Sequence, residues 1–209
     1  FLLEKKVLSQ IKKKKVLDVG TGIGSNLKYF ADQFKNSEFV GIDYNKKLID
    51  YAKKLNKNKR IGFYLANILK NNRLKVKLNN YDLLFSIHTI CCFKNLKKSI
   101  KFLCDFKTKW IAINSLFYDG PLDVEIHMKN NNNHPDGDFN IFSIQTLKEE
   151  LKKNKYTIKV DHPYFPKNPI KRAGKKRGSY TIKTEFNKNT IFSGPIFLPW
   201  HFVLAKRDS

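Results

Sequence analysis

The chain has 209 residues and a mass of 24.5 kDa, which fits one globular domain and excludes two large ones. Hydrophobic residues make up 41% of it and aromatic residues 13%, so it can build a core, and wholesale disorder is excluded although 28% of the residues are charged. The formal net charge is +23. Lysine outnumbers arginine roughly sevenfold and asparagine is abundant, so this charge indicates a compositional bias of the whole surface rather than a nucleic-acid partner.

The sequence carries no sign of a membrane or secreted protein. No apolar run approaches the roughly 18–20 residues that a membrane span needs, and no signal peptide opens the chain, so we expect a soluble, cytoplasmic protein. Phe1 stands within an amphipathic pattern, and we therefore expect residues before it. An odd number of cysteines without CxxC spacing supports neither a disulfide framework nor a zinc site, and we expect core thiols at Cys91, Cys92 and Cys104.

Strand patterns and helix patterns alternate along the first three quarters of the chain. Short apolar runs predict strands at 15–20, 39–43, 61–67, 81–87 and 110–116. Amphipathic spacing predicts helices at 25–34, near 95–104, and after residue 43 with Leu48, Ile49, Ala52 and Leu55 facing inward. Repeated strand–helix units of this kind predict a doubly wound α/β domain with a parallel sheet.

This rhythm changes after residue 116. Residues 117–142 are polar and predict a loop or partial lid, and a helix is expected at 143–154 with Ser143 as its N-cap. Residues 156–160 and 201–205 alternate like the two closing strands of a sheet. The proline-rich residues 161–200 between them form a long insertion, and loops of that length are often functional.

The most specific motif is the glycine turn Asp18-Val19-Gly20-Thr21-Gly22-Ile23-Gly24, at the expected junction of the first strand and first helix. Its spacing is GxGxG, because Ser25 stands where dinucleotide-binding proteins have a third glycine, and the absence of GK[ST] excludes a P-loop. Asp43 ends the second strand about twenty residues later, where a carboxylate in this fold accepts hydrogen bonds from ribose hydroxyls. The two elements together predict a site for a nucleoside-containing cofactor.

The segments DVGTGIGSN, GIDYNKKLIDYAKK, YLANI and YDLLFSIHTI resemble, in this order, those of the class I S-adenosylmethionine-dependent methyltransferases. The resemblance implies a Rossmann-like, seven-stranded, mostly parallel sheet with an antiparallel last strand and helices on both faces. It implies S-adenosylmethionine as the cofactor and S-adenosylhomocysteine as the product. It places the methionine part near the glycine turn, the ribose at Asp43 and the adenine beside Tyr44. The implied cofactor-binding residues are Asp18, Gly20, Thr21, Gly22, Gly24, Asp43, Tyr44, Asn67 and Ser86.

Methyl transfer needs few catalytic side chains, because the protein mainly holds the acceptor in line with the methyl group and excludes water. The resemblance implies that the residues ending the fourth strand, 86–89, face the methyl group. They lack the [DNS]PP[YFW] motif of nucleobase-amine methyltransferases, which argues against such acceptors. His88 is a candidate general base and His127, near Glu125, a second one. Each also fits a structural role.

Acceptor recognition is expected in residues 117–142 and 161–200, which would form a cap on the single domain 1–209. The candidate acceptor-binding residues are Tyr118, Tyr164, Arg172, Arg177, Tyr180 and Trp200. His134, Asp136 and Asp138 are rich in cation ligands, but they lie in an asparagine- and glycine-rich stretch that is more typical of a turn, so no metal is expected.

The leading hypothesis is methylation of oxygen or nitrogen on a small-molecule or glycan-type acceptor, anionic ones included. Two alternatives stay open. One is an RNA methyltransferase that docks through the basic cluster at 171–177. The other is a catalytically silent subunit that binds the cofactor and serves as a partner for another protein.

Overall fold

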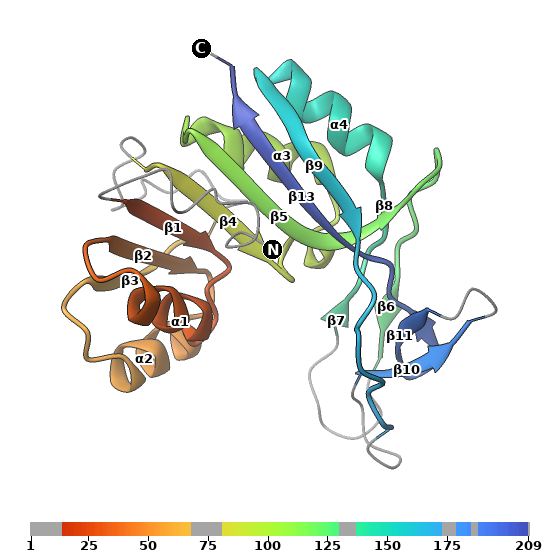
Figure 1. Cartoon of the computed structure of the whole chain (residues 1–209), viewed down its shortest axis with the longest axis horizontal. Coiled ribbons are helices and arrows are strands. Elements are labelled where there is room, and N and C mark those ends of the chain that lie inside the picture. Colours follow the sequence, from red (N-terminus) through yellow and green to blue (C-terminus); the bar gives the residue numbers. More distant parts are fainter. Residues whose placement is uncertain (1–13, 68–80, 130–136, 173–178, 185–187, 209) are drawn as a thin grey trace.

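The central sheet has seven strands in the order β3-β2-β1-β4-β5-β13-β9, and a short eighth strand, β8 (Phe142–Ser143), pairs with the end of β5. The computed structural model describes residues 14–67, 81–129, 137–172, 179–184 and 188–208 (Figure 1). The strands of this sheet are β1 (Lys15–Val19), β2 (Glu38–Asp43), β3 (Ile61–Leu65), β4 (Leu83–Ile87), β5 (Trp110–Tyr118), β9 (Tyr156–Pro163) and β13 (Trp200–Arg207). Strands β1 to β5 pair in parallel, and β13 is antiparallel to both of its neighbours. The expected sheet with an antiparallel last strand is therefore confirmed.

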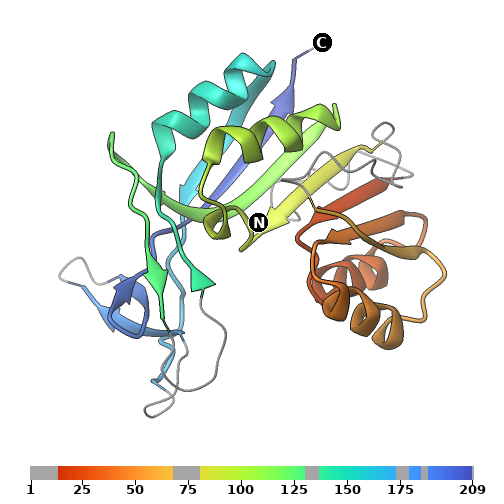
Figure 2. The same ribbon diagram turned by 180° about the vertical axis from the view of Figure 1, so that it is seen from behind.

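Helices cover both faces of this sheet (Figures 1 and 2). One face carries α1 (Ser25–Gln33) and α2 (Lys46–Leu55), and the other carries α3 (Leu96–Asp105) and α4 (Ile144–Lys153). Side chains alternate along β1, so Val16 packs in the first hydrophobic layer and Leu17 in the second. The prediction that Leu55 faces inward is wrong: it is the last residue of α2 and is 55% exposed, whereas Ala52 in the same turn is buried.

The two segments expected as irregular contain short strands. Residues 117–142 hold β6 (His127–Met128), β7 (Gly137–Asp138) and the start of β8 (Phe142–Ser143). Within 161–200, β10 (Ser179–Lys183), β11 (Asn189–Ser193) and β12 (Ile196–Phe197) form a separate antiparallel sheet. Prolines and mixed polar residues hide the period-two pattern of these strands, so the prediction of loops here is wrong for the strand residues. Both views place these strands at the same end of the main sheet (Figures 1 and 2).

A small hydrophobic cluster attaches this cap of short strands to the main sheet. Ile191 and Leu198 from the cap pack with Leu116 of β5, Trp200 of β13 and Cys91. Cys91 lies in a single helical turn, η1 (Ile90–Cys92), that directly follows the end of β4. The cap is thus fixed to the part of the sheet where β4 and β5 end.

None of the helices in the described parts of the chain combines the length and apolar character required to cross a bilayer.

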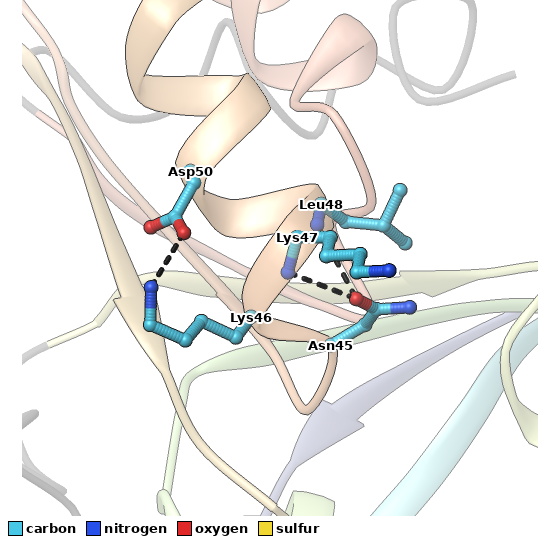
Figure 3. Close-up of polar contacts among 5 residues, drawn as sticks. All are labelled: Asn45, Lys46, Lys47, Leu48 and Asp50. Atoms are coloured by element: carbon cyan, nitrogen blue, oxygen red, sulfur yellow. Dashed lines mark hydrogen bonds and ion pairs between the residues drawn. The ribbon is translucent and has the colours of Figure 1, made fainter.

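The turn between β2 and α2 is closed by side-chain capping. The Asn45 side chain accepts hydrogen bonds from the backbone N–H groups of Lys47 at 3.0 Å and Leu48 at 3.4 Å (Figure 3). At the start of the same helix, Lys46 forms an ion pair with Asp50 at 2.6 Å, and both side chains are more than half exposed (Figure 3). A cap satisfies backbone donors that have no other partner, whereas an exposed ion pair is screened by water.

We predict that Asn45→Ala lowers the free energy of unfolding by about 1 kcal/mol, because the first turn of α2 loses its cap. Asp50→Asn is the matched control in the same helix and should cost only about 0.3–0.5 kcal/mol. Urea unfolding followed by circular dichroism measures both. Equal losses in the two variants would contradict the assigned role of Asn45.

Candidate functional site

The glycine turn between β1 and α1 has a backbone that only glycine adopts easily. Gly20, Gly22 and Gly24 have φ angles of 81°, 55° and 80°. Gly20 and Thr21 donate their N–H groups to the carbonyl oxygen of Ile42 at 2.8 and 3.0 Å, which holds the turn against β2. A Cβ atom on Gly20 would collide with Thr89, but one on Gly22 would meet no atom within 4 Å. The space beside Gly22 is therefore open to a ligand.

Asp43 joins this turn to the next one. Its carboxylate accepts hydrogen bonds from the N–H of Gly22 and the N–H of Asn45, each at 2.9 Å. Asp43 is 8% exposed, so this carboxylate is almost enclosed by the two turns. The bonds fix it at the end of β2, as the sequence spacing requires for contact with a ribose.

A cavity of about 440 Å³ lies at the carboxyl ends of β1, β2, β3 and β4. The order β2-β1-β4 places a topological switch point there. The next strand in the chain, β2, pairs with one edge of β1, and β4 pairs with the other edge. Its volume lies in the range of roughly 300–1,000 Å³ that small-molecule and cofactor sites have. The cavity is lined by Val19, Gly20, Gly22, Ile42, Asp43, Tyr44, Leu48, Ala66, Asn67, His88, Thr89, Cys92 and Phe93.

Five of the nine residues expected to bind the cofactor lie in this wall: Gly20, Gly22, Asp43, Tyr44 and Asn67. The other four, Asp18, Thr21, Gly24 and Ser86, lie outside it. They belong to the strands and the turn that carry the wall residues. The Ser86 hydroxyl, for example, donates to the carbonyl oxygen of Val19 at 3.1 Å and ties β4 to the start of the glycine turn. Direct contact of these four residues with a cofactor stays a prediction.

Asp18 is the most unusual of the four. It is fully buried, and neither carboxylate oxygen has a hydrogen bond to any residue that the structure describes. Burial raises the pKa of Asp18 to about 7, an effect opposed by the nearby Thr21 hydroxyl and reinforced by the charge of Asp43. Asp18 therefore titrates near neutral pH beneath the glycine turn.

His88 lies at the other end of the cavity, directly after β4. Its φ of 55° turns the chain away from the sheet, and its N–H donates to the carbonyl oxygen of Asn114 at 2.9 Å. The ring stacks on Trp200 with 4.0 Å between ring centroids and 25° between planes. Partial loss of hydration lowers the pKa of His88, against a weaker opposing effect of the Asn114 side chain. His88 is therefore neutral at neutral pH and able to accept a proton.

Sequence reasoning missed Cys92 and Phe93, which complete the wall next to His88. The expectation of core thiols holds for Cys91 and Cys104, which are buried, but it is wrong for Cys92, which is exposed. The 3₁₀ turn after β4 directs adjacent cysteines to opposite sides, one to the core and one to the cavity. The sequence signal for Cys92 and Phe93 was their position a few residues after β4, a strand that ends at the site.

The other expected site residues come from the segments 117–142 and 161–200, and none of those that the structure describes lines the cavity. His127 pairs with Asp138 at 2.8 Å across β6 and β7, and neither lines the cavity. Of the expected acceptor residues, Trp200 alone contacts a residue of the cavity wall by ring stacking in the described part of the chain. Tyr118, Tyr164, Arg172 and Tyr180 are outside the wall, and His134, Asp136 and Arg177 lie outside the described residues. No group of three metal-ligating side chains occurs in the described ranges.

The arrangement fits the cofactor that the sequence indicates. The cavity offers a carboxylate at Asp43 for two ribose hydroxyls, an exposed aromatic ring at Tyr44 and open space at Gly22. Asp43, Tyr44 and Asn67 would hold the nucleoside part, and the turn at Gly20 and Gly22 would hold the amino-acid part.

Comparisons with known proteins agree with this geometry. A family model described as a methyltransferase domain matches residues 11–171. Among solved structures, an S-adenosylmethionine-dependent methyltransferase from Methanosarcina mazei has a TM-score of 0.65 and 12% identity, over 99% of this chain and 97% of its own. One from Clostridium acetobutylicum has a TM-score of 0.65 and 11% identity, over 100% of this chain and 89% of its own. No curated protein sequence matches significantly.

Coclaurine N-methyltransferase bound to N-methylheliamine and S-adenosylhomocysteine is also similar, with a TM-score of 0.59 and 15% identity. The similarity covers 78% of this chain and 50% of that one. At these identities the structural similarity concerns the fold.

We predict that Asp43→Ala weakens the binding of S-adenosylhomocysteine by about 1–3 kcal/mol, because charged hydrogen bonds to the ribose are lost. Asp50→Asn, an exposed carboxylate on the adjacent helix, is the control and should bind normally. Calorimetric titration of the two variants measures the difference. Unchanged affinity of Asp43→Ala would refute the ribose-binding role.

We predict that Asp18→Asn changes how stability depends on pH. The pKa of Asp18 is raised from 3.8 to about 7, so the folded state keeps a proton that the unfolded chain releases, and the free energy of unfolding falls between these two pH values. Asparagine does not ionise. The advantage of the variant over the wild type should therefore grow from about pH 4 to about pH 7, by at most about 4 kcal/mol, and then level off. Parallel urea-unfolding stabilities across this range would contradict a buried, titrating Asp18.

Proposed function

The chain belongs to the class I S-adenosylmethionine-dependent methyltransferases, and on this premise we propose that it methylates oxygen or nitrogen on a small-molecule or glycan-type acceptor, anionic ones included. The observation that carries the proposal is where the cap meets the cavity. Trp200 stacks on His88, and Asn140 of the cap binds the backbone of Cys91 and Phe93 at 2.7 and 2.9 Å. An acceptor entering there would lie between cap residues and the cofactor cavity.

The proposed reaction requires few chemical steps from the side chains of the protein itself. S-adenosylmethionine supplies an electrophilic methyl group when it is bound. The chain's task is to bind the acceptor in line, exclude water and remove a proton from the attacking group. His88 is the residue suited to the last task, because it faces the cavity, its ring is held by Trp200 and it is neutral at neutral pH. Thr89, Cys92 and Phe93 would form the wall around the reacting atoms.

The composition of the cavity wall suits a compact acceptor. The cavity is partly apolar through Leu48, Ala66 and Phe93, and the small-molecule sites of proteins combine such apolar lining with a few polar groups.

The proposal is tested by methyl transfer from isotope-labelled S-adenosylmethionine to separate acceptor pools: phenols, amines, carboxylated and phosphorylated compounds, glycans and total RNA. Label in a small-molecule or glycan pool supports it. Label in RNA alone would replace it with the RNA-methyltransferase alternative. Tight binding of S-adenosylhomocysteine without label in any pool would favour the silent-subunit alternative.

We predict that kcat/KM falls as the pH decreases through the pKa of His88, which lies below 6.5, because the protonated ring cannot accept a proton. His88→Ala and His88→Gln should lower kcat by about 10²–10⁴-fold and remove this acid limb. Asp18 titrates nearby, so Asp18→Asn is the control and should keep the limb. The same limb in His88→Ala would show that another group is the base.

A further inference from the structure

The small sheet of the cap carries a row of aromatic rings that the proposed function does not use. Tyr180 of β10 pairs with Phe192 of β11, and Phe192 pairs with Phe197 of β12, so the three residues lie side by side on one face. Their ring centroids are 5.9 Å apart in both pairs, with 25° and 47° between planes. We call Tyr180, Phe192 and Phe197 the aromatic row.

The row lies on the side of the small sheet that faces away from the cap's core. Side chains alternate along a strand, so Ile191 and Ile196 occupy the opposite face, where they pack with Trp200. Phe197 is 44% exposed, and the rings of Tyr180 and Phe192 are half-buried. Three adjacent rings that are partly open to solvent are not needed to hold this sheet on the domain.

The row is held rigidly. The Tyr180 hydroxyl donates to the carbonyl oxygen of Gly194 at 2.8 Å, and Gly194, with a φ of 57°, forms the tight turn between β11 and β12. This hydrogen bond fixes the orientation of the Tyr180 ring, because it connects β10 to the turn that follows β11. A rigid platform loses little entropy when a flat ligand stacks on it.

Positive charge lies against the row at Arg172, and the segment that carries the row is basic in sequence. The guanidinium of Arg172 lies 5.3 Å from the centre of the Tyr180 ring, and the Lys188 ammonium lies 4.8 Å from that of Phe165. Residues 164–200 contain eight lysines and arginines but one acidic residue, and two of the chain's five arginines are among them. Lysine exceeds arginine threefold in this segment and tenfold in the rest of the chain, so arginine is enriched here.

We infer that the aromatic row and Arg172 form a docking surface for single-stranded nucleic acid. Bases stack on aromatic side chains and on guanidinium planes, while a basic surface binds the phosphates, and together these are what sequence-tolerant single-strand sites use. A neutral glycan would account for the aromatic rings but not for the positive charge. A polyanion without bases would account for the positive charge but not for the rings. The inference concerns binding, and it holds whether or not the bound strand is a methyl acceptor.

The test is fluorescence anisotropy with a labelled single-stranded oligouridine of about twelve nucleotides, a length within the range that such surfaces bind. Because the whole chain is basic, salt-dependent binding alone proves nothing, and the variants decide. Phe197→Ala and Phe197→Leu should each weaken binding about tenfold, since loss of one stacked base costs about 1–3 kcal/mol, and Phe197→Tyr should restore it. Arg172→Ala should weaken binding and reduce its salt dependence.

Tyr51→Ala is the matched control, because Tyr51 is 59% exposed on the distant helix α2, and it should bind RNA normally. Unchanged calorimetric binding of S-adenosylhomocysteine in each variant verifies folding and is independent of RNA. Heparin supplies charge without bases, and Phe197→Ala should bind it normally. The inference is overturned if the oligonucleotide does not bind at low salt, or if Phe197→Ala and Phe197→Leu bind it as the wild type does, which would leave only nonspecific charge attraction.

Discussion

The buried carboxylate of Asp43 is the contact on which the cofactor cavity depends. It accepts one hydrogen bond from the glycine turn at Gly22 and one from Asn45, the N-cap of α2. Two turns that are separated in sequence are thereby held at one point, with the open side of Gly22 facing the cavity. Charge-assisted hydrogen bonds to nearly enclosed groups are stronger than neutral ones, so this carboxylate both shapes the site and remains positioned for a ligand.

The opposite end of the cavity is built differently. There the chain leaves β4 through His88, whose backbone is in the left-handed region, and enters a single 3₁₀ turn. The cap is attached at this place by ring stacking on Trp200 and by the hydrogen bonds of Asn140. The end at the glycine turn therefore rests on backbone geometry and one carboxylate, whereas the end at His88 rests on packing between distant segments.

The small sheet of the cap has two faces with different partners. Ile191 packs inward with Trp200, which stacks on His88 at the cavity, while Phe192, its neighbour in sequence, belongs to the exposed aromatic row. This division follows from the alternation of side chains along a strand.

The charge of the cavity differs from the charge of the chain as a whole. The chain is strongly basic, yet Asp18 beneath the cavity and Asp43 within its wall are acidic.

The sequence by itself determined the main sheet, the glycine turn and the pairing of that turn with Asp43, because each depends on local signals: apolar periodicity, glycine spacing and a carboxylate at a strand end. It also placed Ser143 as the N-cap of α4, where the side chain accepts from Thr146. Only the tertiary structure decided the rest. Cys91 and Cys92 are adjacent residues of the same type, and only the 3₁₀ turn that contains them buries one and exposes the other. The strands of the cap, the stacking of Trp200 on His88 and the row of Tyr180, Phe192 and Phe197 arise from pairing between remote segments, which no local pattern encodes.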